Sequence, residues 1–243
     1  RLYRSSDKAV TMTTVSQAPI ISNVPISSIS IARTDDNVRL VGLNNGSVFS
    51  TSTGSSTLTN ITALSAPAVP VGRVAIDPLD KKTAYVCYGG YGVAAGAHVW
   101  KTTNLDAANP TWVVSGVGIP DIPVNAFAID PGNTSIVFAG TDIGVYVSID
   151  AGVTWNSYSA GLPVAPVFDM AIHPVTKALR IATHGRGFWQ STNPVIPVEY
   201  SAFYATAKSN GKVLLEWYTS SESNNKGFNI ERAVYNNNTN LLK

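Results

Sequence analysis

The sequence is poor in the residues that form disulfides, metal sites and charged binding surfaces. Cys87 is the only cysteine among 243 residues, so neither an internal disulfide nor a paired-cysteine metal site can form. Charged residues make up 13% of the chain, roughly half the usual share. The 17 basic and 15 acidic residues leave a net charge of +2 and no basic cluster, which excludes the electrostatic footprint of a nucleic-acid binder. We expect no metal and no cofactor.

Long apolar runs are also missing. No stretch approaches the length of about 18 apolar residues that crosses a bilayer, so we expect no membrane span. The first residues, R-L-Y-R-S-S-D, contain no initiator methionine and no apolar stretch, which predicts that a signal peptide is absent or was removed upstream of this fragment. Cys87 lies among apolar neighbours and is predicted to be a buried, unreactive thiol. The 44% hydrophobic content, with polarity supplied by Ser, Thr and Asn, suits an all-β protein.

Internal repeats organise most of the chain. Residues 124–148 read V-N-A-F-A-I-D-P-G-N-T-S-I-V-F-A-G-T-D-I-G-V-Y-V-S, and they align without a gap on 26–50 and on 167–191. A fourth copy begins at Val74 with V-A-I-D-P. Each copy contains an apolar strand, a D-P or H-P turn or its equivalent, a second apolar strand, a glycine-bounded turn and a third strand. Four antiparallel strands in roughly 40 to 50 residues predict a blade of a β-propeller.

The repeats also predict the domain boundaries. We place the tail of one blade at 1–21, full blades at 25–70, 71–122 and 123–165, and a three-stranded blade at 166–193. Residues 1–193 are then the C-terminal part of a larger ring. A proline-containing linker at 194–200 precedes 201–243, where alternating strands at 202–207, 213–218 and 228–233 are too few for a complete sandwich. The predicted fold class is all-β: a partial propeller of about four four-stranded blades, then the start of a truncated β-sandwich.

The turn at 148–155, S-I-D-A-G-V-T-W, follows the third strand of the best-preserved repeat. An aspartate in such a turn accepts backbone N–H bonds, a glycine permits positive φ, hydroxyls bridge the strand ends and a tryptophan covers the blade edge. The residues in these roles are Ser148, Asp150, Gly152, Thr154 and Trp155. We interpret the turn as a structural clasp, which excludes Asp150 as a catalytic acid. A worn copy, S-S-D-K-A-V-T-M, occupies 5–12.

Two motifs resemble those of known propellers. The turn at 148–155 resembles the Asp box of the BNR repeats in sialidases, xyloglucanase-type glycosidases and the sortilin (Vps10) propeller. This resemblance implies that the turn lies at the blade periphery, away from an active centre. The run I-A-T-H-G-R-G-F-W at 181–189 resembles the closing strand of the last blade in those families, which implies that its fourth strand comes from elsewhere. His184 and Arg186 lie on its hairpin turn and are candidates for ligand contact.

The C-terminal segment carries a third resemblance. Residues 197–233 include P-V-E-Y-S-A-F, L-E-W-Y-T and N-N-K-G-F-N-I-E-R, and they resemble a fibronectin-III-like module of proteins exported by the bacterial type IX pathway. This resemblance implies an extracellular or outer-surface location on a bacterium. It also implies a sorting domain beyond this fragment.

Two classes of function remain open. The first is a secreted or cell-surface propeller that acts as a non-catalytic binding or scaffold module, with a polysaccharide or surface glycan as its candidate partner. The loop at 88–97 carries Tyr88 and Tyr91 among glycines, and Trp100 follows it; these aromatic residues are candidates to stack on sugar rings. The oligomeric state is not set by the sequence.

The alternative is part of a xyloglucanase- or sialidase-like glycoside hydrolase, with catalytic residues partly outside this chain. Glycoside hydrolysis needs two carboxyl groups flanking the scissile bond. The carboxyl groups expected at inner-strand ends and loops belong to Asp121, Asp142 and Asp169, of which Asp142, in G-T-D-I-G, is the candidate for a catalytic role. A sialidase also needs an arginine cluster, but the candidate arginines are scattered along the sequence, at Arg33, Arg73, Arg180 and Arg186.

Overall fold

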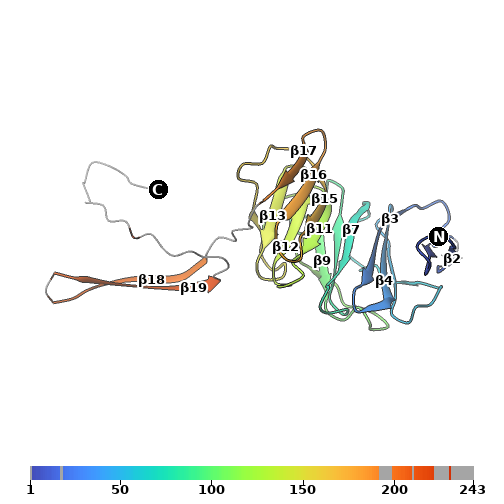
Figure 1. Ribbon diagram of the computed structural model, residues 1–243, viewed down its shortest axis with the longest axis horizontal. Coiled ribbons are helices and arrows are strands. Elements are labelled where there is room, and N and C mark those ends of the chain that lie inside the picture. Colours follow the sequence, from blue (N-terminus) through green and yellow to red (C-terminus); the bar gives the residue numbers. More distant parts are fainter. Residues whose placement is uncertain (1, 17–18, 192–198, 210, 222–229, 231–243) are drawn as a thin grey trace. The chain divides into compact units, whose positions relative to one another are not determined.

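The computed structural model describes residues 2–16, 19–191, 199–209, 211–221 and 230, and it divides into two units, Arg1–Pro194 and Val195–Lys243. The described residues form strands and turns, and no helix among them could cross a membrane. The first unit holds a two-stranded N-terminal hairpin, three four-stranded sheets and one three-stranded sheet, all antiparallel (Figure 1). The all-β prediction and the three-stranded last blade are therefore confirmed.

Each sheet is a simple meander in which consecutive strands are neighbours. The N-terminal hairpin consists of β1 (Tyr3–Arg4) and β2 (Thr13–Thr14). The first blade consists of β3 (Ile26–Ala32), β4 (Asp35–Leu43), β5 (Val48–Thr51) and β6 (Thr59–Asn60). The second consists of β7 (Val71–Ile76), β8 (Ala84–Tyr88), β9 (Val99–Thr102) and β10 (Val113–Val114). The third consists of β11 (Val124–Ile129), β12 (Val137–Thr141), β13 (Gly144–Ser148) and β14 (Asn156–Ser157), and the fourth of β15 (Val167–Ile172), β16 (Leu179–Thr183) and β17 (Gly187–Gln190).

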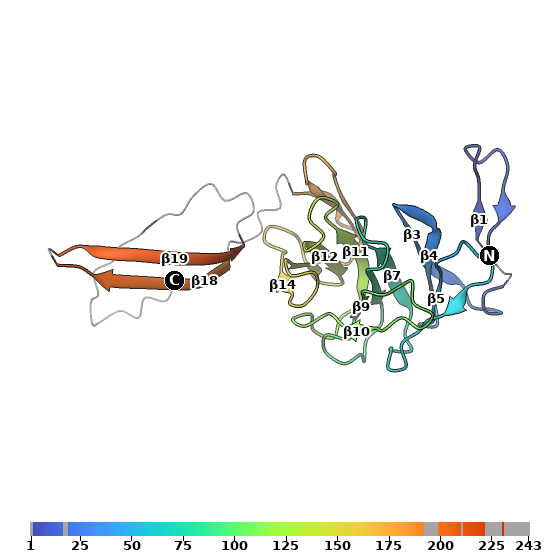
Figure 2. The same cartoon turned by 90° about the horizontal axis from the view of Figure 1, so that it is seen from below.

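The blades stand side by side through their first strands. β3 contacts β7, β7 contacts β11 and β11 contacts β15, so the inner strands follow one another in chain order (Figure 2). Apolar side chains of successive blades fill the space between them. Leu40 and Val48 of the first blade pack with Val74 and Val86 of the second. Burial of these faces against each other drives the arrangement, because a single blade cannot cover both of its own faces.

The second and third blades share the largest aromatic cluster. Tyr85 is fully buried and its ring lies 4.9 Å from that of Phe127, which in turn lies 5.9 Å from the ring of Trp155. Cys87 joins the same cluster with no exposed surface, and burial raises the pKa of its thiol. The thiol is therefore buried in the protonated form, as predicted.

Every inner strand carries a β-bulge at its second residue. The pairing with the next strand shifts between Ile26 and Ser28, and it shifts at the same place in the other three blades. The extra residues are Ser27, Gly72, Asn125 and Phe168. A bulge leaves one residue out of the ladder and re-aims its side chain.

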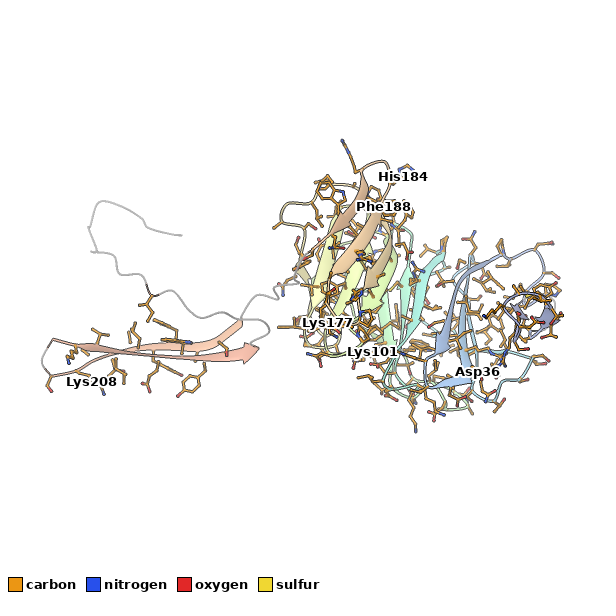
Figure 3. The ribbon with its side chains drawn as sticks, viewed as in Figure 1. Asp36, Lys101, Lys177, His184, Phe188 and Lys208 are labelled. Carbon is orange, nitrogen blue, oxygen red and sulfur yellow. The ribbon has the colours of Figure 1, made fainter. Side chains whose placement is uncertain are left out.

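The alternation of strand direction creates two ends. One end holds the turns between third and fourth strands, including 148–155, and is here named the clasp end. The other end holds the turns between second and third strands together with the links from one blade to the next, and is named the loop end. In Figure 3, Lys101 and Lys177 lie at the clasp end, opposite His184 at the loop end.

Hydrogen bonds fasten the 148–155 turn from within. The Ser148 hydroxyl donates to the Asp150 carboxylate (2.6 Å) and accepts from the Gly152 amide (2.8 Å). Asp150 also accepts from the amide (2.9 Å) and the hydroxyl (2.6 Å) of Thr154. Burial raises the pKa of Asp150, but the hydrogen bonds from Ser148 and Thr154 outweigh burial and hold the pKa below its ordinary value. The fourth strand of this blade, β14, is two residues long, and Trp155, which precedes it, is buried.

The worn copy at 5–12 repeats these bonds one for one. Ser5 donates to Asp7 (2.7 Å) and accepts from the Ala9 amide (2.7 Å), and the Thr11 amide and hydroxyl donate to Asp7 (2.9 and 2.6 Å). Because Thr11 and Ser5 surround it with donors, the pKa of Asp7 falls to about 2. Ala9 has φ 70°, where the corresponding residue of the 148–155 turn, Gly152, has φ 90°.

Two further clasps escape the sequence pattern. In the first blade the Thr51 hydroxyl accepts from the amides of Thr53 (3.3 Å) and Ser55 (3.1 Å). In the second blade Thr102 donates to Asn104 (2.8 Å), and Asn104 accepts from the Thr111 amide (2.8 Å) across a turn that is three residues longer. Threonine or asparagine in the key positions and the longer turn hide the repeat from alignment.

The second unit is described as one hairpin, β18 (Glu199–Ala207) with β19 (Val213–Ser221). β18 begins inside the expected linker, at Glu199, and the two strands cover those expected at 202–207 and 213–218. Residues 194–198, most of the third expected strand and the matches at 222–229 lie outside the described residues.

Candidate functional site

Polar side chains from the second and third blades meet at the loop end. The connection between β8 and β9 is the glycine-rich loop 89–98, which was noted for its tyrosine. The link from the second blade to the third, 115–123, runs beside it, because the Gly96 amide donates to the Ile119 carbonyl (3.2 Å). The short turn between β12 and β13 adds Asp142. Three connections that are far apart in sequence therefore form one corner.

Asp142 is the centre of one half of this corner. Its Oδ2 accepts a hydrogen bond from the Tyr91 hydroxyl (2.6 Å), and its Oδ1 accepts one from Asn125 Nδ2 (2.8 Å). Asn125 is the bulged residue of β11, so the bulge directs its amide toward the loop end. The Tyr91 side chain is 63% exposed, and its hydrogen bond to Asp142 raises the pKa of its hydroxyl. The result is an exposed aromatic ring fixed at its tip by a carboxylate.

Asp121 is the centre of the other half. It accepts hydrogen bonds from the amides of Gly92 (3.0 Å) and Val93 (3.1 Å), the two residues that follow Tyr91. Its Oδ1 also lies 3.0 Å from Nε2 of His98, whose ring has no exposed surface. The Val93 amide, then His98, lower the pKa of Asp121 below its ordinary value. Asp121 thus stays ionised and ties down the same loop that Tyr91 projects from.

The backbone permits this corner only because a glycine lies at the bulge of β7. A Cβ at Gly72 would lie 2.3 Å from the Val124 carbonyl oxygen, so any other residue would push β7 away from β11. The close approach brings the loop of the second blade within reach of Asn125 and Asp142 on the third.

Asp169, the third candidate carboxylate, belongs to a separate contact. It lies on β15 and forms an ion pair with Arg73 of β7 that reaches past the third blade. Nε of Arg73 is buried, and no partner for it lies among the described residues. The structure therefore brings Asp121 and Asp142 to one loop and places Asp169 on a neighbouring blade.

The remaining sequence candidates are spread over the molecule. His184 and Arg186 are exposed on the turn between β16 and β17, where the His184 ring packs edge-on against Phe168 at 5.7 Å. Figure 3 shows His184 beside Phe188, which is 88% exposed. Trp100, by contrast, is 5% exposed, packs in the core and donates its indole N–H to the Ala97 carbonyl. Its ring offers no free face for a sugar.

The clasp residues lie at the other end and are used for contact between blades. The Ala151 carbonyl accepts from the Tyr85 hydroxyl (3.0 Å) and from Lys101 Nζ (2.9 Å), both of the preceding blade. The Trp155 indole N–H donates to the Ser115 carbonyl (2.7 Å). The Ala151 carbonyl and the Trp155 indole therefore attach the turn to the second blade and the link that follows it. Asp150 faces its own turn rather than the corner around Tyr91.

A groove of about 110 Å³ lies between the N-terminal hairpin and the first blade, lined partly by Leu2, Ile29 and Ile31. It is smaller than the few hundred Å³ of typical ligand pockets and contains none of the sequence candidates.

Sequence reasoning missed His98 and Asn125, two of the residues that organise the corner. Asn125 sits at the second position of its repeat, where the other copies have Ser27, Gly72 and Phe168, so a variable residue inside a repeated strand was the available signal. His98 gave a weaker signal, since a lone histidine before a strand is common in protein cores.

The fold can be compared with known proteins at this point. No protein-family model matches the chain, and no curated protein does. Solved structures define its class as that of β-propeller domains: it superimposes on the β-propeller domain of Myceliophteria thermophila Cps50 (Swd1) with a TM-score of 0.50 and 10% identity over 81% of this chain and 59% of that one.

Two enzymes of the GH74 group are also similar in fold. The Niastella koreensis GH74 enzyme matches with a TM-score of 0.54 and 15% identity over 78% of this chain, and the GH74 xyloglucanase from Xanthomonas campestris with 0.54 and 16% over 80%. The chain spans 30% and 38% of their respective lengths. At these identities the likeness defines the fold.

Proposed function

We propose that this chain is part of a non-catalytic glycan-binding propeller and that Tyr91, Asp142 and Asn125 at the loop end contact the sugar. The observation that carries the proposal is the exposed Tyr91 ring held at its tip by Asp142, whose second oxygen accepts from Asn125. A fixed aromatic face beside a planar carboxylate and a planar amide is the combination that recognises a sugar ring and its hydroxyls. The similar fold of a xyloglucanase supports the choice of a polysaccharide.

The carboxyl groups favour binding over hydrolysis. A glycosidase needs one carboxyl that stays protonated near neutral pH, which burial in apolar surroundings provides. Asp121 is 43% exposed and has a lowered pKa, and Asp169 is 68% exposed and paired with Arg73. Asp142 accepts a hydrogen bond at each oxygen. These three groups suit fixed acceptors for sugar hydroxyls.

The same groups select the charge of the ligand. Asp121 and Asp142 both raise the pKa of Tyr91 through their negative charge, so the ring lies in a negative field. A uronic acid or sialic acid would meet that field with its own carboxylate and be repelled. We therefore assign neutral polysaccharides, such as β-glucans, as the ligand class.

The test is a binding measurement with the full chain. Calorimetry with xyloglucan and cello-oligosaccharides is expected to detect binding, while polygalacturonate and sialyllactose give none. Tyr91→Ala is expected to lower the affinity at least tenfold, or about 1.4 kcal/mol, the scale of one aromatic contact. Tyr3→Ala is the matched control, since Tyr3 is 57% exposed on the N-terminal hairpin and should leave affinity unchanged.

Two results would contradict the proposal. One is no binding to any neutral glycan of the panel. The other is release of reducing sugar that disappears in Asp142→Asn, which would establish the glycoside hydrolase alternative.

Location and domain organisation are part of the same proposal. The resemblance of 197–233 to a type IX module supports a secreted or surface protein in which the propeller and a C-terminal sandwich form separate domains. Detection of the native protein in the culture medium or on intact cells, by antibody, is the expected result. Recovery only from the cell interior would contradict it.

A further inference from the structure

His98 occupies an unusual position for a histidine. Its ring is completely buried between β8 and the 115–123 link, yet both of its nitrogens face oxygen atoms. Nδ1 lies 3.2 Å from the Tyr88 carbonyl oxygen, and Nε2 lies 3.0 Å from the Asp121 carboxylate. A neutral imidazole has one N–H and one lone pair, so it can serve only one of these acceptors, whereas the imidazolium serves both.

Asp121 connects the His98 ring to the glycine-rich loop. Its carboxylate accepts the amides of Gly92 and Val93, and Val93 anchors the loop with a side chain that is 7% exposed. Tyr91, the preceding residue, bonds Asp142 on the next blade. Two successive hydrogen-bonded contacts, from His98 to Asp121 and from Asp121 to the Gly92 and Val93 amides, thus connect the buried ring to the backbone next to the exposed aromatic side chain.

We propose that His98 is a proton-dependent latch, a positioning residue whose doubly protonated ring holds Asp121 and thereby orders the 91–93 loop. The latch is a property of the fold, and its effect on glycan affinity rests in addition on the proposed function.

The charged surroundings are consistent with a latch that responds to one proton. The titratable groups around the ring are Asp121, which bonds it, Tyr91 and Asp142 across the loop, and Tyr88 and Cys87 on β8. Burial raises the pKa of both Tyr88 and Cys87, so they stay neutral. Arg73, whose charge acts on Cys87, is paired with Asp169. Asp121 is therefore the one carboxylate that bonds the ring among the described residues.

The direction of the pH dependence follows from the two partners. When pH rises and the ring gives up a proton, one of its two hydrogen bonds is lost, so the latch weakens toward alkaline pH. When pH falls through the lowered pKa of Asp121, the carboxylate is protonated and stops accepting two amides, so the latch also weakens in strong acid. The loop is most ordered between these limits.

The first test reads the ring directly in the full chain. In ¹⁵N NMR spectra at pH 6, both nitrogens of His98 are expected to give the shifts of protonated nitrogens and to keep slowly exchanging protons. His184, whose ring is exposed, is the internal reference, and its ring protons should exchange rapidly with solvent. A His98 ring with one protonated nitrogen at pH 6 would overturn the latch.

The second test reads the loop. Amide-exchange protection of Gly92 and Val93 is expected to fall about tenfold as pH rises from 6 to 9, after correction for intrinsic exchange, because a charge-assisted bond is lost. Thr154 is the matched control amide, since it donates to Asp150 with no histidine involved. In His98→Gln, and in Asp121→Asn should the former fail to fold, protection should be low and independent of pH.

The His98 latch and the proposed glycan binding can each be contradicted without contradicting the other. Unchanged protection of Gly92 and Val93 across pH and in both variants would remove the latch even if neutral glycans bind through Tyr91. A pH-dependent loop without any glycan binding would keep the latch and remove the proposed ligand.

Discussion

The clasp end and the loop end of the same blades are organised in opposite ways. At the clasp end, the N-terminal hairpin and three blades of the first unit each fasten a turn with a Ser or Thr hydroxyl that accepts a backbone amide. The amide lies four residues on at Ser5, Thr51 and Ser148 and two residues on at Thr102. At the loop end, some backbone bonds recur, such as those from the Asn44 amide to the Pro25 carbonyl and from the Gly89 amide to the Pro70 carbonyl. The turn between second and third strands, however, varies from two residues after β12 to ten after β8. The turns that repeat belong to the scaffold, whereas the turns that differ between blades are where a ligand can be recognised.

The largest expected effect comes from removing the best clasp's tryptophan. Trp155→Ala deletes a ring that is 3% exposed, packs on Phe127 and donates to the Ser115 carbonyl. We expect the free energy of unfolding of the first unit to fall by about 3–5 kcal/mol, measured by urea denaturation with circular dichroism. Met12→Ala is the control, because Met12 fills the equivalent position at 59% exposure and should change stability by less than about 0.5 kcal/mol. Equal losses of stability in Trp155→Ala and Met12→Ala would contradict the expectation that the more deeply buried residue contributes more to stability.

Removing the clasp carboxylate should cost less. Asp150→Ala loses the bonds from Ser148 and Thr154, and because the carboxylate is only half-buried we expect a loss of about 2 kcal/mol in urea denaturation. Asp150→Asn keeps an acceptor for the Thr154 amide, as Asn104 does for Thr111, and should lose about half as much. A larger loss for Asn than for Ala would contradict this account.

The turn position held by Gly152 and by Ala9 has a positive φ, and substitutions at these two residues test the strain on the backbone. Gly152→Ala places a Cβ 2.6 Å from the Ser115 hydroxyl at φ +90°, and should destabilise the first unit by about 2 kcal/mol. Ala9→Gly relieves a left-handed alanine and should stabilise the N-terminal hairpin by roughly 0.5 kcal/mol, after the extra chain entropy of glycine is subtracted. Amide exchange of Thr11 measures the second change. Faster exchange in Ala9→Gly would refute the claim of strain.

The smallest effect on stability is expected at the loop end. Asp142→Ala removes a half-buried acceptor from a short turn, and should change the free energy of unfolding by less than about 0.5 kcal/mol. It should nevertheless free Tyr91, which is detected as faster motion of the ring in NMR relaxation. A loss of stability on the scale of Trp155→Ala would remove the distinction between the two ends.

The part of the fold that was predictable is the part that repeats. The D-P turns, the apolar strands and the S-x-D-x-G-x-T-W turn recur at nearly constant spacing, because each blade must bury the same two faces against its neighbours. The clasps at Thr51 and Thr102 were missed because several residue types can supply the same bonds. Their roles depend on geometry, which alignment does not detect.

The candidate site was less predictable for a physical reason. Asp142 and Tyr91 were identified as separate candidates 51 residues apart, but their contact depends on how closely two blades approach at Gly72. His98 acts through Asp121, a partner that no spacing rule links to it. Trp100 was identified by residue type alone, and burial removes it from consideration. Contacts between loops are set by packing of the blades, which the local sequence does not encode.

The recurring bulge gives the rim of this fold a particular capacity for change. Because the extra residue does not belong to the strand ladder, its side chain can be replaced without altering how the strands pair. Gly72 is the exception, since a side chain there would meet the Val124 carbonyl of the next blade. The four natural occupants are as different as serine, glycine, asparagine and phenylalanine. The scaffold therefore offers three separate sites of variation, at Ser27, Asn125 and Phe168, and new specificities can evolve or be engineered there one blade at a time.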